Sequence, residues 1–268
     1  MYSDRMRNND PRLRRRDPGM TTRHAIGHSL RTYYAPGRAE ALDAFLTRFL
    51  GPGELGFDIG AHVGDRTASF RRLGARAVAV EPQPRLARLL RLLFGRDPGV
   101  VRVAALAGAQ PGAAVLRLNT ANPTVATASA AFIAAAAGAA GWEGQVWDGA
   151  LRLPVTTLDA LADAHGFPDF VKIDVEGFEA AALAGLTRAP RSLSFEFTTI
   201  QREVAQACLT RLEALGYRAF NACLGESMRF AHTAPIGAAA MADWITALPN
   251  TANSGDVYAS LEPARLRA

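Results

Sequence analysis

Residues 55–64 read Leu-Gly-Phe-Asp-Ile-Gly-Ala-His-Val-Gly, a short apolar run that ends in a turn bounded by two glycines. The apolar run is typical of a buried strand, and residues 66–73 beyond the turn have the pattern of a helix. Gly60 lets the backbone turn tightly and approach a ligand, while the helix N-terminus offers unpaired N–H groups to a carboxylate. The stretch therefore predicts a ligand-binding loop at the carboxyl edge of a parallel sheet.

Segments with strand and helix patterns alternate along the chain from residue 54 onward. We expect strands over residues 55–59, 77–80, 100–106, 113–118, 151–156, 170–173, 193–197, 217–221 and 256–260, and helices over residues 66–73, 85–94, 158–165, 178–186 and 201–215. This alternation is typical of βαβ units, so it predicts a doubly wound α/β fold with a mostly parallel sheet. We assign residues 54–262 to one catalytic domain, residues 26–53 to a helical cap and residues 1–25 to a basic, disordered tail.

Composition narrows the class of protein. Hydrophobic residues make up 49% of the chain, enough for a substantial core. Cys208 and Cys223 are the only cysteines, so neither a disulfide framework nor a zinc site is indicated, and we expect a cytoplasmic protein. The longest apolar run, residues 130–140, is much shorter than the roughly 20 residues of a membrane span. We therefore expect no membrane partner.

The net charge of +5 does not by itself indicate a nucleic-acid partner. Much of the excess lies in the first two dozen residues, as in the run Arg14-Arg15-Arg16. Arginine replaces lysine almost everywhere and Lys172 is the sole lysine, which together with abundant alanine indicates a coding bias. We expect no nucleic-acid partner.

Residues 119–150 show neither a helical nor a strand period, and they contain Trp142 and Trp147. Irregular segments of this length inside a compact domain are usually functional or disordered. We interpret the segment as a substrate lid, with a poorly ordered insertion as the alternative.

Two carboxylates identify the ligand that the glycine loop would take. Asp58 ends the first strand and is placed to accept from an ammonium group, and Glu81 ends the next strand, where a carboxylate can accept both hydroxyls of a ribose. An amino acid beside a ribose describes S-adenosylmethionine. A dinucleotide oxidoreductase would need G-x-G-x-x-G at this loop, and that motif is absent. The structural alternative is that the glycines serve only the turn and that Glu81 caps the helix beyond Pro82.

Residues 171–179 read Val-Lys-Ile-Asp-Val-Glu-Gly-Phe-Glu and carry a second cluster of charged residues. Together with Asp58-x-Gly60-Ala61-x-x-Gly64, Glu81-Pro82 and Thr156-Thr157-Leu158-Asp159, this run resembles the successive motifs of FkbM-type methyltransferases over about residues 50–260. The resemblance implies a seven-stranded Rossmann-like methyltransferase fold, S-adenosylmethionine as methyl donor, and O-methylation of natural products or saccharides. His62 departs from the family, which often has Asn at this position.

The donor-binding residues follow from the loop, the second strand and the charged run. We expect the donor to be bound by Asp58, Gly60, Ala61, His62, Gly64, Glu81, Pro82 and Asp174.

Alternation along a strand places Lys172, Asp174 and Glu176 on one side of the sheet. Lys172 could hold either Asp174 or Glu196 ionised, and clustered ionisable groups are common at catalytic sites. Asp174 is our first choice for a general base, with Glu196 and His62 as alternatives and Lys172 as supporting cation; a structural ion pair is the competing interpretation.

The remaining carboxylates leave two questions open. Glu176 and Glu179 could serve catalysis or only the first turn of the following helix. Asp174 and Glu196 could bind a hard cation such as Mg²⁺, but no third ligand is evident, so we predict no metal.

The resulting hypothesis is in-line attack of a hydroxyl of a small molecule, natural product or saccharide on the donor methyl. One alternative is a non-catalytic module that binds S-adenosylmethionine or a related nucleoside. The other is a nucleic-acid methyltransferase, but base-amine methyltransferases commonly have Asn/Asp-Pro-Pro-Tyr/Phe where this chain has Asp174-Val175-Glu176-Gly177.

Overall fold

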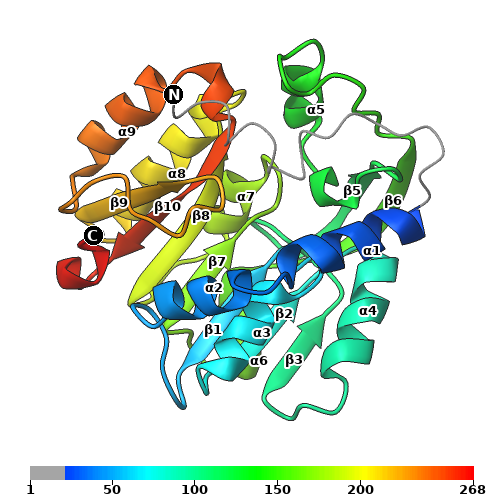
Figure 1. Cartoon of the computed structure of the whole chain (residues 1–268), viewed down its shortest axis with the longest axis horizontal. Helices are drawn as coiled ribbons and strands as arrows, with labels where there is room; N and C mark the ends of the chain where they lie inside the picture. The colour runs from blue at the N-terminus through cyan, green and yellow to red at the C-terminus, as the bar shows by residue number, and fades with distance from the viewer. Residues whose placement is uncertain (1–21) are drawn as a thin grey trace.

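The computed structural model describes residues 22–268 (Figure 1). The N-terminal cap consists of α1 (Thr22–Tyr33) and α2 (Arg38–Leu46). Because α1 begins at Thr22 and buries Ala25, residues 22–25 belong to the cap and the boundary predicted at residue 25 is four residues too late. The rest of the predicted tail lies outside the described residues.

A seven-stranded sheet forms the centre of the protein. Its strands are β1 (Leu55–Ile59), β2 (Arg76–Val80), β3 (Val100–Val103), β7 (Phe170–Ile173), β8 (Ser192–Thr198), β9 (Ala219–Leu224) and β10 (Ser254–Ser260). They lie in the order β3-β2-β1-β7-β8-β10-β9, and β10 runs antiparallel to both of its neighbours while the other pairs are parallel. The predicted α/β fold with a mostly parallel sheet is confirmed, and so is the strand number that the family resemblance implied.

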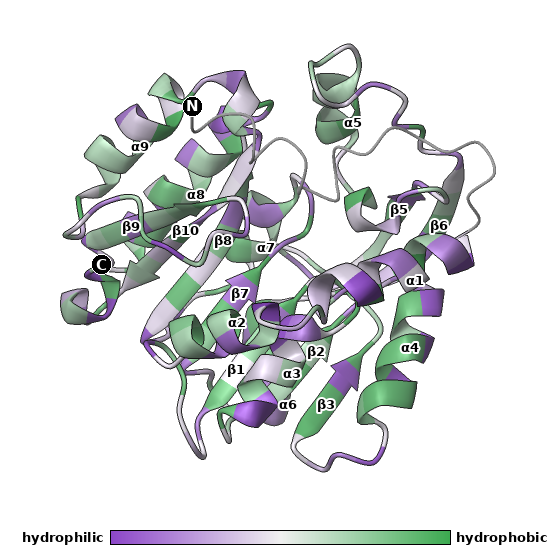
Figure 2. Ribbon diagram, in the orientation of Figure 1, coloured by the Kyte–Doolittle hydropathy of each residue, from purple (hydrophilic) through white to green (hydrophobic). Residues whose placement is uncertain are grey.

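Helices cover both faces of this sheet, as a doubly wound fold requires. Apart from the short α5 described below, the helices that follow the cap are α3 (Asp65–Arg72), α4 (Pro84–Phe94), α6 (Leu158–His165), α7 (Glu179–Ala184), α8 (Arg202–Ala214) and α9 (Ala238–Ala247). Apolar side chains of α2, α3 and α4 pack in one buried cluster, and those of α6, α7, α8 and α9 pack in another. The strands between these layers are coloured mostly white to green in Figure 2, as expected for a sheet buried on both faces.

Polar side chains on one face of this sheet lie in rows at its carboxyl edge. Asp58 of β1 pairs in register with Lys172 of β7, which pairs with Ser194 of β8. One step nearer the edge, Glu196 of β8 pairs with Asp256 of β10. The parallel strands therefore bring ionisable groups from distant parts of the chain to one place.

A second, three-stranded sheet contains β4 (Leu106–Ala107), β5 (Gly112–Leu118) and β6 (Gly149–Thr156) in the order β4-β6-β5. The single strand predicted over residues 100–106 is therefore wrong at its end. Val100–Val103 pairs with β2, whereas Leu106 pairs with Val155 of β6 in the other sheet.

The segment over residues 119–150, which joins β5 to β6, contains more regular structure than its sequence indicated. It includes η2 (Pro123–Val125) and α5 (Ala130–Ala136). Phe132 and Trp142 are buried in a small cluster, and the indole of Trp147 donates a hydrogen bond to the carbonyl of Val125 at 2.8 Å. The segment thus has regular structure and packed aromatic side chains, while its role as a lid stays a prediction.

Two further features complete the description. Helix α9 was not predicted, because residues 238–247 are apolar at most positions and show no clear period. None of the helices formed by residues 22–268 has both the length and the apolar character needed to cross a bilayer.

Candidate active site

The glycine loop packs directly against the carboxyl end of β7. Gly60 has a φ of 84°, and a Cβ atom there would lie 1.8 Å from the carbonyl oxygen of Asp174. Gly64, with a φ of 80°, precedes the first residue of α3, and a Cβ there would lie 2.7 Å from Leu90 and Phe94. Both positions therefore require glycine, and the loop is fixed between the α3 N-terminus and the backbone of Asp174.

Glu81 ties this loop to the next strand. Its Oε2 accepts a hydrogen bond from the backbone N–H of His62 at 2.9 Å, and its Oε1 accepts one from Gln83 at 2.8 Å. Burial raises the pKa of Glu81 to about 8, although the two backbone donors act to lower it. The carboxylate thus contacts both the loop and the residue that precedes α4, while its contact with a ribose stays a prediction.

Asp58 faces α3 instead of the open edge. It is 1% exposed, and its Oδ2 accepts a hydrogen bond from the hydroxyl of Thr67 at 2.6 Å. Burial raises its pKa to about 6. Asp58 is not among the residues that line the pocket described next, so its position favours support of the loop over direct contact with a ligand.

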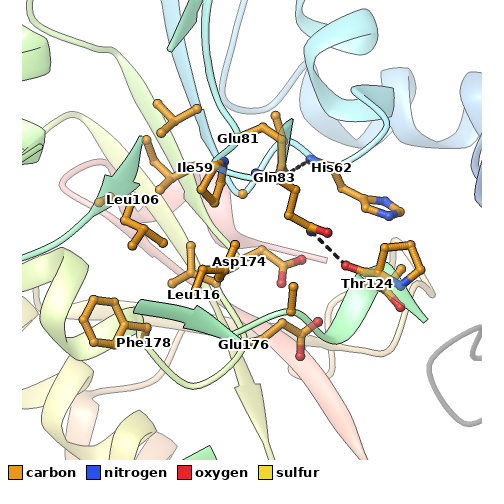
Figure 3. A pocket seen from close by; sticks show the side chains of 18 of the residues that line it. Ile59, His62, Glu81, Gln83, Leu106, Leu116, Thr124, Asp174, Glu176 and Phe178 are labelled. Carbon is orange, nitrogen blue, oxygen red and sulfur yellow. Dashed lines mark hydrogen bonds between the residues drawn. The ribbon is translucent and has the colours of Figure 1, made fainter. Parts of the chain in front are cut away.

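A pocket with about 830 Å³ of empty space, open solvent included, lies at the carboxyl edge of the main sheet, between the glycine loop, the second sheet and the cap (Figure 3). Of the eight residues predicted to bind a donor, six line it: Gly60, Ala61, His62, Glu81, Pro82 and Asp174. Glu176, which the sequence left undecided, also lines it. Several other lining residues were missed from the sequence: Tyr33, Asp65, Arg66, Gln83, Leu106, Leu116, Pro123, Thr124, Phe178 and Glu226. Of these, Asp65 and Arg66 directly follow the glycine motif and could have been found, whereas Glu226 carries no local signal.

The lid segment supplies part of the pocket wall. Pro123 and Thr124 line the cavity, and the side-chain amide of Gln83 donates a hydrogen bond to the carbonyl of Pro123 at 2.9 Å (Figure 3). The hydroxyl of Thr127 donates one to the carbonyl of Glu176 at 2.6 Å. The segment therefore contacts both the loop that follows β2 and the turn that follows β7.

Asp174 and Glu176 enter the pocket from the turn after β7 (Figure 3). Carboxylate oxygens of Asp174, Glu176 and Glu196 lie within 4.8 Å of one another. Three such oxygens could ligate a hard cation such as Mg²⁺, and Glu176 is the third ligand that was not evident from the sequence. Glu196 itself is not among the residues that line the pocket.

Glu179 and Glu176, which the sequence left undecided, have different surroundings. Glu179 is buried, and its Oε1 accepts backbone N–H hydrogen bonds from Val175 at 2.9 Å and Gly177 at 3.2 Å. Burial raises its pKa to about 7, while backbone hydrogen bonds act to lower it. Glu179 therefore shapes the turn, and Glu176, with a φ of 54°, is turned toward the pocket.

Lys172 lies beneath this turn and does not line the pocket. Its Nζ donates a hydrogen bond to Asp256 Oδ1 and lies 3.6 Å from Asp174 Oδ2. Burial acts to lower the pKa of Lys172, but the carboxylates of Asp256 and Asp174 outweigh it and raise the pKa. The predicted contact with Asp174 is present, but the hydrogen-bonded partner is Asp256, which was not singled out from the sequence.

Arg66 extends this ion-pair network to the pocket wall. Its guanidinium lies 2.8 Å from Glu226 Oε2, 3.0 Å from Asp65 Oδ2 and 3.9 Å from Asp256 Oδ2. Arg38 of α2 lies 3.0 Å from the same Glu226 oxygen. Ion pairs thus connect the cap, α3 and the loop after β9. At one end of this network, Asp256 contacts Lys172, which lies close to Asp174.

The Methyltransferase FkbM domain matches residues 58–219. Curated protein sequences gave no match.

Solved methyltransferase structures also match this chain, at low identity. A TehB-like SAM-dependent methyltransferase from Corynebacterium glutamicum is 12% identical over 88% of this chain and 96% of its own, with a TM-score of 0.45. Methyltransferase FkbM from Methylobacillus flagellatus is 15% identical over 87% of this chain and 58% of its own, with a TM-score of 0.44. Precorrin-6y C5,15-methyltransferase from Geobacter metallireducens is 15% identical over 82% of this chain and 87% of its own, with a TM-score of 0.41.

Proposed function

Because the chain belongs to the FkbM methyltransferase family and is an S-adenosylmethionine-dependent methyltransferase, we propose that it methylates a hydroxyl group of a small molecule, natural product or saccharide. The observation that carries the proposal is the position of Asp174. Its carboxylate enters the pocket from the turn whose backbone abuts Gly60, so a proton acceptor lies beside the loop that would hold the donor.

The residues of the glycine loop and Glu81 fit S-adenosylmethionine. Gly60 lets the loop pack against the backbone of Asp174, and the α3 N-terminus beyond the loop can receive the carboxylate of the donor's amino acid. Glu81 can accept hydrogen bonds from the two ribose hydroxyls. The space beyond the methyl group is left for the acceptor.

In the proposed reaction, the acceptor oxygen forms a bond to the methyl carbon as the bond from that carbon to the sulfonium sulfur breaks. The bound donor supplies an already activated methyl group and leaves as S-adenosylhomocysteine. Asp174 accepts the hydroxyl proton, and Glu196 and His62 are the alternative acceptors. The chain's main task is to hold the oxygen in line with the methyl.

The reaction is proposed to take place in the cytoplasm. In agreement with a reducing compartment, Cys208 and Cys223 are both buried and neither forms a disulfide.

The test is formation of S-adenosylhomocysteine with a panel of hydroxylated metabolites and saccharides, with the methylated atom identified by NMR. We expect an O-methyl product from at least one member. Donor binding by calorimetry without turnover on any acceptor would favour the non-catalytic module. Methylation of RNA or DNA, with binding that weakens steeply as salt rises, would favour the nucleic-acid enzyme.

A further inference from the structure

Lys172 is the only lysine among the 30 lysine and arginine residues of the chain. Arginine serves at every other basic position, so the one ammonium group stands out by its place: it is 2% exposed and lies below the proposed base. An ammonium is a compact point charge with three donors, whereas a guanidinium is a wide planar fork that pairs with a carboxylate through two bonds. A guanidinium at this position would therefore not reproduce the compact charge of the Lys172 ammonium.

Lys172 is divided unequally between two carboxylates. It donates a hydrogen bond to Asp256, whereas its 3.6 Å separation from Asp174 is too long for a hydrogen bond and leaves an ion-pair contact. Ionic attraction persists at this distance in a buried setting, so Lys172 still stabilises a negative charge on Asp174. A carboxylate that accepted a direct charged hydrogen bond would be a weaker proton acceptor.

Asp256 is itself held in place. It lies on β10, in register with Glu196 of β8, and is 7% exposed. While its Oδ1 accepts from Lys172, its Oδ2 lies 3.9 Å from the guanidinium of Arg66. Arg66 is anchored in turn by Asp65 and Glu226. Asp256 therefore has a cation on each side, which fixes the position of the ammonium between the strands.

We propose that Asp256 is a positioning residue that holds the ammonium of Lys172 away from Asp174, so that Asp174 is kept ionised without accepting a hydrogen bond from Lys172. The kinetic part rests on the proposed function, in which Asp174 is the base. Without Asp256, Lys172 would move onto Asp174 and compete with the acceptor hydroxyl for its oxygens.

Other charged groups also act on Asp174 or Lys172. They are Asp58 from β1, Arg66 from α3, Glu81 after β2, Glu176 between β7 and α7, Glu179 at the start of α7, and Glu196 from β8. All of them are retained in the variants below. These groups determine the pH at which the rate of the wild type falls. The direction in which that pH shifts on substitution depends on Lys172 and Asp256.

NMR gives a direct test. Because Lys172 is the only lysine, protein made with lysine labelled at Cε and Nζ would give a single side-chain signal. We expect Asp256→Asn to shift this signal more than Asp174→Asn does. We also expect Asp174→Asn to have a larger effect in the Asp256→Asn background than in the wild type, because the ammonium would then lie on Asp174. Equal effects of Asp174→Asn in both backgrounds would overturn the inference. This readout needs no acceptor, so it stands or falls separately from the proposed function.

Kinetics give a second test. Asp256→Asn should lower kcat about tenfold, short of the roughly 10²–10⁴-fold that a general base contributes. The acid limb of the pH–rate profile should move to lower pH, because Lys172 would pair more tightly with Asp174. Lys172→Met removes the cation, so its acid limb should move to higher pH. In the Lys172→Met background, Asp256→Asn should leave the limb where it is.

Controls separate positioning from folding. Asp243→Asn removes the same charge at an exposed site on α9 and should leave kcat and the profile unchanged. If Asp256→Asn does not fold, Asp256→Glu, which keeps the charge, and the double variant with Lys172→Met, which removes both charges, carry the test. An Asp256→Asn shift of the limb that persists without Lys172 would overturn the inference. A wild-type pH–rate profile without an acid limb would also overturn the inference, but it would leave the proposed methyl transfer intact.

Discussion

The two halves of the pocket are built in different ways. The half proposed for the donor contains the glycine loop and Glu81. It is held by hydrogen bonds from backbone N–H groups to the Glu81 carboxylate and by glycines that tolerate no side chain. The half proposed for the acceptor brings together Asp174, the lid segment and Glu226 from distant parts of the chain. Backbone geometry thus limits where a donor could bind, whereas the charged side chains around Asp174 would govern proton transfer from the acceptor.

Asp174→Asn should have the largest effect, because Asp174 lies where the two halves meet. The substitution preserves volume and removes the charge, so the variant should fold and bind S-adenosylhomocysteine within severalfold of wild type. Turnover should fall about 10²–10⁴-fold if Asp174 is the general base. The measurement is single-turnover formation of S-adenosylhomocysteine with the best acceptor. Near-normal turnover would transfer the base assignment to Glu196 or His62, and collapse of the fold would favour a structural pair with Lys172.

Gly60→Ala should break the donor half by itself. The Cβ would meet the carbonyl of Asp174, and the positive φ alone costs about 1–3 kcal/mol for a residue other than glycine. We expect donor affinity to fall roughly a hundredfold, equal to about 2.7 kcal/mol, as measured by calorimetry. Gly53→Ala is the matched control, since Gly53 has a φ of 81° with no atom within 4 Å of its added Cβ. It should lose stability only, and equal loss of donor affinity in both variants would contradict the role of close packing.

These two positions show what could be predicted from the sequence. The strands at residues 55–59 and 170–173 and the helix at residues 158–165 were predicted at their observed bounds, because each has a strong pattern and clear ends. Gly60, Glu81 and Asp174 were found because each directly follows a strand. Asp256 and Glu226 were not, since no local pattern relates them to residues about 80 positions or more away; β10 and the loop after β9 bring them there. Asp58 was predicted to contact the donor, but its side chain faces Thr67.

Glu81 gives the donor half a dependence on pH. Its pKa is about 8 in the folded protein, so it is mostly protonated at pH 7 and must ionise to accept two ribose hydroxyls. Donor affinity should therefore rise as pH increases, by roughly tenfold between pH 7 and pH 9, as the ionised fraction grows. Glu81→Ala should weaken binding roughly ten- to more than a hundredfold, and the pH dependence should vanish. Calorimetry at three pH values provides the measurement, and an affinity that falls with pH would remove Glu81 from the donor site.

The segment over residues 119–150, the predicted lid, should differ from the donor half by moving when ligands bind. Its wall contacts predict closure over the acceptor, so proteolysis within residues 119–150 should slow severalfold when donor product and acceptor are both bound. Chymotrypsin suits the test because the segment contains Phe132, Trp142 and Trp147 but neither lysine nor arginine. The Trp244→Phe variant leaves tryptophan fluorescence to Trp142 and Trp147 alone. Cleavage and fluorescence that are the same with and without ligands would show that the segment is fixed structure.

The smallest effect is expected from removing metal. Asp174, Glu176 and Glu196 have the oxygens to ligate Mg²⁺, but positive charge already reaches this edge from the ammonium of Lys172 and the guanidinium of Arg66, and the sulfonium of the donor would add to it. A divalent cation would also occupy the oxygens of Asp174, so that Asp174 could no longer accept the proton of the acceptor hydroxyl. Turnover should therefore be unchanged by EDTA and by added Mg²⁺. If EDTA abolishes turnover and Mg²⁺ restores it in wild type but not in Glu196→Gln, the three carboxylates bind a metal that organises the acceptor half, and the general-base assignment of Asp174 gives way to metal ligation.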